Sequence, residues 1–186
     1  MSWRDTPQAY GLVSRLLHWG MVVLFTWQFA GMGLRRLGIL QPLADAIRST
    51  HGLVGTILLL LVLLRGAWGL TQFARRPSPP TSSGHLATFG HLVIYLLMLT
   101  VPTLALLRLW GAGRAYAPLG IPLFDGAQGQ TPWLVSLGNA LHGELAWVLL
   151  AVIAGHVLMV VVHRVMGPQD VLPRMAGPLR QGGDHH

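Results

Sequence analysis

The stretch LHGELAWVLLAVIAGHVLMVVVHRV, from Leu141 to Val165, decides the fold class. It is almost wholly apolar, and about 20 such residues in a helix are enough to cross a bilayer. Three histidines, His142, His156 and His163, interrupt it at intervals of fourteen and seven residues. Multiples of seven keep side chains on one helix face, and fourteen residues span about 21 Å of helix axis. The stretch therefore predicts a membrane-spanning helix with a histidine near each membrane surface.

Three further apolar stretches are long enough to span a bilayer, which gives spans at 11–34, 47–70, 90–110 and 141–165. Only 10% of the 186 residues are charged and 52% are hydrophobic, whereas soluble domains carry about 25% charged residues. The prediction is an all-α membrane protein, a four-helix transmembrane bundle in one domain over residues 1–186. An outer loop is expected at 111–140, with a short interfacial helix that starts at Pro132. The first span contains Arg15 and His18 and lacks a small-residue cleavage site, so we expect a mature helix rather than a signal peptide.

The net charge of +7 comes from arginine, since the chain has no lysine. These arginines flank apolar stretches, as in membrane proteins, which argues against nucleic acid as a partner. With the N-terminus in the cytoplasm, the arginines divide eight inside against five outside. The inner ones are Arg4, Arg15, Arg65, Arg75, Arg76, Arg164, Arg174 and Arg180, and the outer ones are Arg35, Arg36, Arg48, Arg108 and Arg114. This bias favours both termini inside.

Cysteine is absent, which excludes disulfides, cysteine-ligated iron–sulfur clusters and c-type haem attachment. Any metal must therefore be held by histidine, methionine or oxygen ligands. His185 and His186 end a polar tail and are expected to be solvated. His85 follows a Pro/Ser-rich stretch at 75–84 and is expected in a loop.

Histidines inside a membrane usually face the bundle interior for a functional reason. The predicted topology pairs them by depth, His18 with His156 toward the cytoplasm and His51 with His142 toward the outside. Paired histidines are typical axial ligands of b-type haem in electron transfer, because no coordination site remains for a substrate. Glycines beside them, Gly20, Gly52, Gly55 and Gly155, either leave room for a porphyrin or only allow close helix packing.

Two arginines accompany these pairs. Arg65 lies fourteen residues after His51 and at the depth of His156. It is either a snorkelling interfacial residue or a partner for a haem propionate or a quinone. Arg48, three residues before His51, is a candidate for the outer haem propionates.

At this point the sequence resembles the bacterial cytochrome b561 family of small di-haem membrane cytochromes, and within it the superoxide oxidases. The resemblance covers nearly the whole chain. It rests on RLLHW around His18, HGLVG from His51, GHLVIYLL from Gly90 followed by Pro102, the spacing of the three histidines quoted first, and the tail 169–175.

The resemblance implies two haem b groups, with His18 and His156 as inner ligands and His51 and His142 as outer ligands. It implies that His91 and His163 line a cytoplasmic quinone pocket, to which we add Arg65 as a candidate catalytic residue. Superoxide would give electrons at the outer face and ubiquinone would receive them inside, in the inner membrane of a bacterium. Arg35 and Arg36 are expected to be ordinary interfacial residues.

Two other functions remain open. The chain is alternatively a haem-bearing membrane anchor that links a partner dehydrogenase or hydrogenase to the quinone pool. Against it, the loops are short and no docking domain is evident. A cofactor-free transporter or channel, with histidines as metal or proton sites, is disfavoured by their matched depths.

Overall fold

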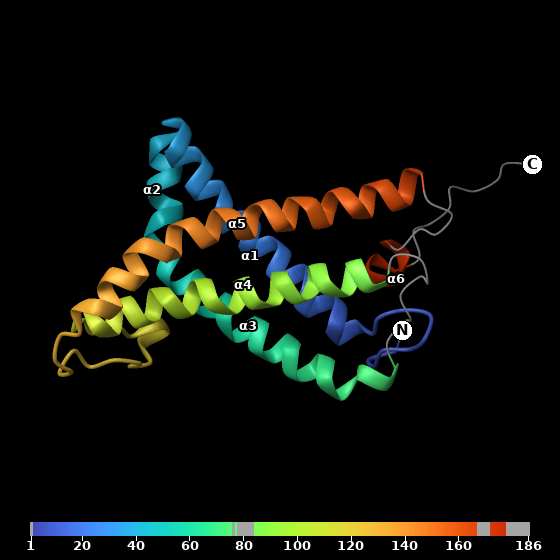
Figure 1. The fold of residues 1–186 in the computed structure, drawn as a ribbon, viewed down its shortest axis with the longest axis horizontal. Coiled ribbons are helices and arrows are strands. Elements are labelled where there is room, and N and C mark those ends of the chain that lie inside the picture. The colour runs from blue at the N-terminus through green and yellow to red at the C-terminus, as the bar shows by residue number, and fades with distance from the viewer. Residues whose placement is uncertain (1, 76, 78–83, 167–171, 178–186) are drawn as a thin grey trace, which may run out of the picture.

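The protein is helical over most of its described length (Figure 1). The computed structural model describes residues 2–75, 77, 84–166 and 172–177. In chain order the helices are α1 (Leu12–Leu37), α2 (Gln41–Ser49), α3 (His51–Thr71), α4 (Gly84–Gly111), α5 (Pro132–Val165) and α6 (Leu172–Ala176), with 3-10 turns η1 (Phe73–Arg75) and η2 (Pro118–Gly120). No strand occurs in these residues beyond an isolated bridge between Tyr116 and Phe124. The all-helical prediction is confirmed, while Arg76, Arg180, His185 and His186 lie outside the described residues.

Three helices of the described chain, α3, α4 and α5, are long and apolar enough to cross a membrane. Helix α1 has 26 residues, which also suffices in length. Its side chains include His18, Trp27 and Gln28, which lower its hydropathy below that of the other three. Three of the four expected spans are therefore found by length and composition, and the span of α1 stays a prediction.

The apolar stretch expected to begin at residue 47 is divided in the structure. Helix α2 ends at Ser49 and α3 begins at His51, with Thr50 between them. The Thr50 hydroxyl donates to the Ile47 carbonyl (2.8 Å), and the Trp27 indole N–H of α1 donates to that hydroxyl (2.9 Å). These bonds hold the elbow between α2 and α3 against α1, immediately before His51.

Helices α4 and α5 are longer than the apolar stretches that predicted them. Helix α4 begins at Gly84, so His85 lies in its first turn and not in the expected loop. Helix α5 runs without interruption through 34 residues from Pro132, so the separate interfacial helix is not formed and the outer loop is limited to 112–131. Pro132 is compatible with this start because the first helical residues need no N–H partner within the helix.

The helices pack in a chain of pairs. The most extensive contact is between α4 and α5. In addition, α4 packs on α3, α3 packs on α1, and α1 packs on α2. The shared core consists of Met21, Val54, Leu58, Val62, Met98 and Leu149. The N-terminus, α6 and the last turns of α3 and α5 lie at one end of the molecule, and the α4–α5 loop lies at the other (Figure 1). We call these the inner end and the outer end.

Candidate functional site

The outer end brings His51 of α3 and His142 of α5 together. Their ring centroids lie 6.0 Å apart and their planes are inclined by 78°. Both residues are partly buried. His51 is the first residue of α3, directly after the elbow at Thr50, and His142 lies in the outer part of α5. This is the outer pair that the depth argument expected.

The ring orientation of His142 is set by a neighbouring helix. Its Nδ1 lies 2.9 Å from the Val101 carbonyl oxygen of α4. A carbonyl only accepts hydrogen bonds, so Nδ1 carries the proton and Nε2 keeps its lone pair. A metal-bound histidine commonly donates its other ring N–H to a backbone carbonyl, which orients the ring and raises its basicity. His142 therefore has the environment of a metal ligand.

The geometry of the outer pair fits a metal held between the two rings. A metal–imidazole bond is about 2 Å long, and with the radius of each ring two trans ligands place their centroids about 6 Å apart. The separation of His51 and His142 matches this value. Neutral imidazole nitrogens are suitable ligands for iron. The ring separation of the outer pair is therefore compatible with a metal such as the iron of a haem, which His51 and His142 would hold.

The inner end holds a second cluster, made of His18, His91, His156 and Arg65. His91 and His156 have ring centroids 5.1 Å apart, with planes inclined by 68°. His18 is within electrostatic reach of Arg65, His156 and His91. The expected partners His18 and His156 share this cluster, and so does His91, which the sequence placed in a separate quinone pocket. The structure therefore joins three histidines where two were paired.

The spacing within the inner cluster distinguishes these three histidines. At 5.1 Å the rings of His91 and His156 are closer than the roughly 6 Å needed for a metal between them. His91 also bonds its Nδ1 to the Ala87 carbonyl of its own helix (2.7 Å). The ring separation thus argues against a metal held directly between His91 and His156, and the pairing of His18 with His156 as inner ligands stays a prediction.

Arg65 is tied to the first turn of α1. Its Nη1 donates to the Ser14 carbonyl at 2.6 Å. The Ser14 hydroxyl in turn donates to the buried carboxylate of Asp5 (2.7 Å) and accepts from the Trp68 indole (3.0 Å). This network holds the guanidinium next to His18, so Arg65 does not simply extend into solvent.

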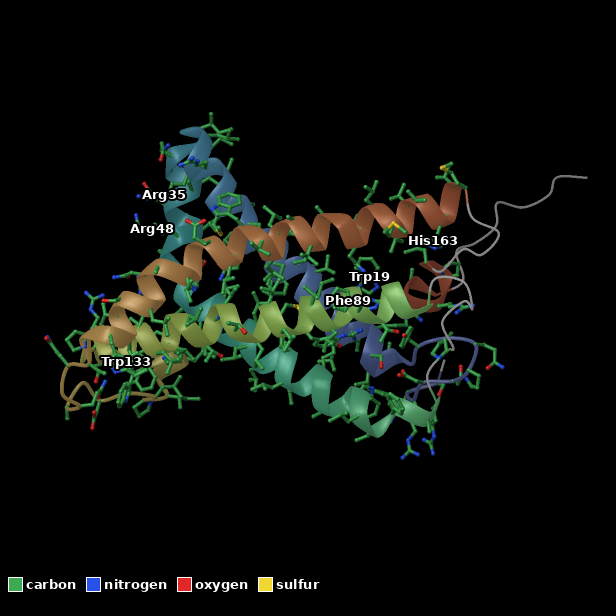
Figure 2. All side chains as sticks on the ribbon, viewed as in Figure 1. Trp19, Arg35, Arg48, Phe89, Trp133 and His163 are labelled. Atoms are coloured by element: carbon green, nitrogen blue, oxygen red, sulfur yellow. The ribbon has the colours of Figure 1, made fainter. Side chains whose placement is uncertain are left out.

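The other candidates lie at the edges of the two clusters. His163 is seven residues beyond His156 and bonds its Nδ1 to the Met159 carbonyl (2.7 Å), near the inner end of α5 (Figure 2). Arg48 is exposed on α2 and within electrostatic reach of His51. Figure 2 shows Arg48 and Arg35 at the α2 side of the molecule.

The glycines beside the histidines divide into two groups. A Cβ added at Gly20 or Gly155 would meet no atom within 4 Å. At Gly52 it would lie 3.5 Å from the Tyr116 hydroxyl, and at Gly55 it would lie 3.5 Å from the Gln28 amide nitrogen. Gly20 and Gly155 therefore face open space, and at Gly52 and Gly55 a methyl group would make only ordinary van der Waals contacts, so neither close packing nor a porphyrin site is decided by these glycines.

Sequence reasoning missed two polar residues at the outer pair. Gln28 is 7% exposed, and its amide N–H donates to the His51 carbonyl at 3.0 Å. Arg108 of α4 is within electrostatic reach of His51. Gln28 carried a signal, because it is polar within an apolar span. Arg108 was counted only for its side of the membrane, since its approach to His51 depends on how α4 packs.

Comparison with known proteins identifies the family of the chain. The family model described as prokaryotic cytochrome b561 matches residues 9–178. Cytochrome b561 homolog 2 of Escherichia coli (strain K12) is 27% identical over 95% of this chain and 96% of its own length. A probable superoxide oxidase, CybB of Yersinia pestis, is 25% identical over 89% of this chain and 94% of its own length. Because the family model covers most of the chain, the protein belongs to the prokaryotic cytochrome b561 family of membrane electron-transfer proteins.

Proposed function

We propose that the protein oxidises superoxide at its outer end and reduces ubiquinone at its inner end. The observation that carries the proposal is the presence of two histidine clusters on α5, at His142 and His156. Fourteen residues of helix separate them by about 21 Å. One family relative is named a probable superoxide oxidase, which favours superoxide as the donor.

Haem b is the cofactor of this family. In the proposal, His51 and His142 hold one haem and His18 and His156 hold the other. When bound, the two haems would supply one-electron carriers, each held by two histidines. Val101 fixes His142 in the tautomer that such binding requires. Gln28 fixes the backbone of His51.

The overall reaction balances in electrons and protons. Two superoxide anions each lose one electron and become dioxygen, while one ubiquinone takes two electrons and two protons and becomes the quinol. The protons must come from the inner side, where His91 and His163 are the proposed donors. Both residues have Nδ1 engaged with a backbone carbonyl. Nε2 is therefore the atom that takes up and releases a proton.

Arg65 has a positioning role in this proposal. Its guanidinium carries five N–H donors, one of which bonds the Ser14 carbonyl. The others are proposed to donate to a quinone oxygen or a haem propionate near His18. A bond to a charged group of this kind contributes about 1.5–3 kcal/mol.

The test uses the purified, haem-loaded protein with a superoxide source and a ubiquinone analogue. Quinol formation should follow superoxide supply at half its molar rate, and added superoxide dismutase should abolish it. A His51→Ala variant that lacks the outer haem serves as the control and should produce no quinol above background. Rapid reduction of the haems without quinol formation would instead favour a cytochrome that serves a protein redox partner.

A further inference from the structure

Arg108 lies in the last turn of α4 at the outer end and is oriented by α5. Its Nη1 donates to the Asn139 side-chain oxygen at 3.1 Å. Asn139 precedes His142 by three residues, so both lie on one face of α5. The bond therefore holds the guanidinium one helical turn outward of the outer histidine pair.

The backbone at the root of Arg108 is fixed by a close helix contact. A Cβ added at the buried Gly138 would lie 2.6 Å from the Arg108 Cβ and 3.0 Å from the Leu104 carbonyl oxygen. Only a residue without a side chain allows α4 and α5 to approach this closely. Arg108 is consequently anchored at both ends, at its Cβ by Gly138 and at its guanidinium by Asn139.

The titratable groups that act on the His51 ring are all basic. Those that act on His51 are His142, Arg108 and Arg48. Arg48 precedes His51 by three residues, as Asn139 precedes His142. Within the described residues no carboxylate pairs with Arg108, and Asn139 uses one of its five N–H donors. Arg108 is exposed, and together with Arg48 it gives the outer end a positive charge that attracts anions.

We propose that Arg108, held by Asn139, is an anion-binding residue of the outer site that receives an oxygen anion beside His51 and His142. The inference rests on the proposed function. The same chemistry has two sources, a carboxylate of the haem held by the outer pair, or the free superoxide anion. In the first case Arg108 anchors the cofactor, and in the second it guides the substrate to it.

The experiment compares haem-loaded full-length variants in detergent: Arg108→Gln, Arg108→Lys, Asn139→Leu, and Arg36→Gln as the control. Arg36→Gln removes the same charge from the same side of the membrane. Two quantities are measured, the midpoint potential of the outer haem and the rate of haem reduction by superoxide as ionic strength is varied.

If the anion is a haem carboxylate, Arg108→Gln makes the midpoint potential more negative, because an uncompensated carboxylate disfavours the added electron. If it is free superoxide, the potential stays constant while the rate falls roughly tenfold and loses most of its salt dependence. Arg108→Lys should keep both the midpoint potential and the rate closer to the wild-type values than Arg108→Gln does, because it keeps the positive charge. Asn139→Leu should shift the potential or the rate in the same direction as Arg108→Gln but by less, because the guanidinium is still present but no longer held.

The proposal is overturned if Arg108→Gln matches Arg36→Gln in both potential and rate. Should Arg108→Gln fail to accumulate, Asn139→Leu decides, and wild-type values for both measurements overturn the proposal. A wild-type protein that binds haem but is not reduced by superoxide refutes the proposed function. In that case the midpoint potentials of the variants still test the carboxylate source.

Discussion

The two ring nitrogens of each candidate histidine have different environments. His142 bonds its Nδ1 to a carbonyl on another helix, at Val101. His91 and His163 bond theirs to carbonyls four residues earlier in their own helices. An interhelical bond orients a ring relative to the bundle, as a metal ligand requires. A bond within the helix orients the ring only relative to its own helix.

Replacing one ligand of a pair should remove one haem and leave the other. We expect His51→Ala to purify with one haem and to retain the spectrum of the inner haem. We expect His18→Ala to show the reverse, because the two pairs share no residue. Haem per polypeptide and the reduced-state absorption spectrum measure both. Two haems with unchanged spectra in both variants would refute the ligand assignment.

His91 offers a separate test, because its ring lies against His156. If His18 is the second inner ligand, His91→Ala retains two haems while quinol formation falls by about 10²-fold, the usual contribution of a proton donor. His163→Ala should also retain two haems and form quinol more slowly. Loss of the inner haem from His91→Ala would instead make His91 the ligand and contradict the pairing with His18.

At the scale of elements, the outer site depends on how α2 and α3 meet α1. Trp27 and Gln28 are adjacent in α1. Trp27 bonds to Thr50 at the elbow, and Gln28 bonds to His51, the next residue. One turn further along α1, Gly31 packs directly on Ile47 of α2, so that an added Cβ would overlap the Ile47 side chain. The position of His51 therefore follows from the packing of three helices.

This packing predicts a difference between two glycines on one helix. Gly31→Ala should destabilise the protein by about 1–3 kcal/mol, because a methyl group is forced against a β-branched side chain. Gly33→Ala is the control, since its Cβ would meet no atom within 4 Å. Thermal unfolding in detergent measures both. Ile47→Ala combined with Gly31→Ala should recover part of the loss, and an equal effect of the two glycine substitutions would contradict the contact.

At the scale of the whole molecule, the two ends carry different machinery. The inner end has the N-terminal segment and α6 together, with Tyr10 donating its backbone N–H to the Arg174 carbonyl (3.0 Å). The Arg15 side chain bonds the Ala176 carbonyl there as well. The outer end has the α4–α5 loop, whose Tyr116 hydroxyl lies 2.9 Å from the Thr56 hydroxyl of α3. In the predicted topology these two ends face opposite sides of the membrane.

The cysteine-free chain makes this topology simple to test. Single substitutions Ser2→Cys at the inner end and Ala127→Cys in the outer loop introduce one reactive thiol each. A membrane-impermeant maleimide applied to spheroplasts should label Ala127→Cys and should label Ser2→Cys only after lysis. The opposite pattern would place the N-terminus outside and reverse the proposed direction of electron flow.

Several features of the site were predictable from residue spacing. The proximity of His51 and His142 follows from their positions near the starts of two helices, α3 and α5, that run in the same direction, since a helix rises by a constant amount per residue. Spacing did not predict the approach of His91 to His156, because rotation of α4 about its axis is set by its packing on α5. The break at Thr50 was missed for a related reason, since an apolar run does not reveal a turn held by the side chain of another helix.

Sequence alone determined that the chain is helical and apolar, and that α5 carries histidines fourteen residues apart on one face. These properties are local, because they depend on composition and on the periodicity of one helix. The tertiary structure decided that His91 joins His18 and His156, that Val101 orients His142, and that Arg108 is within electrostatic reach of His51. Such contacts join residues remote in the chain, and they exist only once the crossing and rotation of the helices are set by packing.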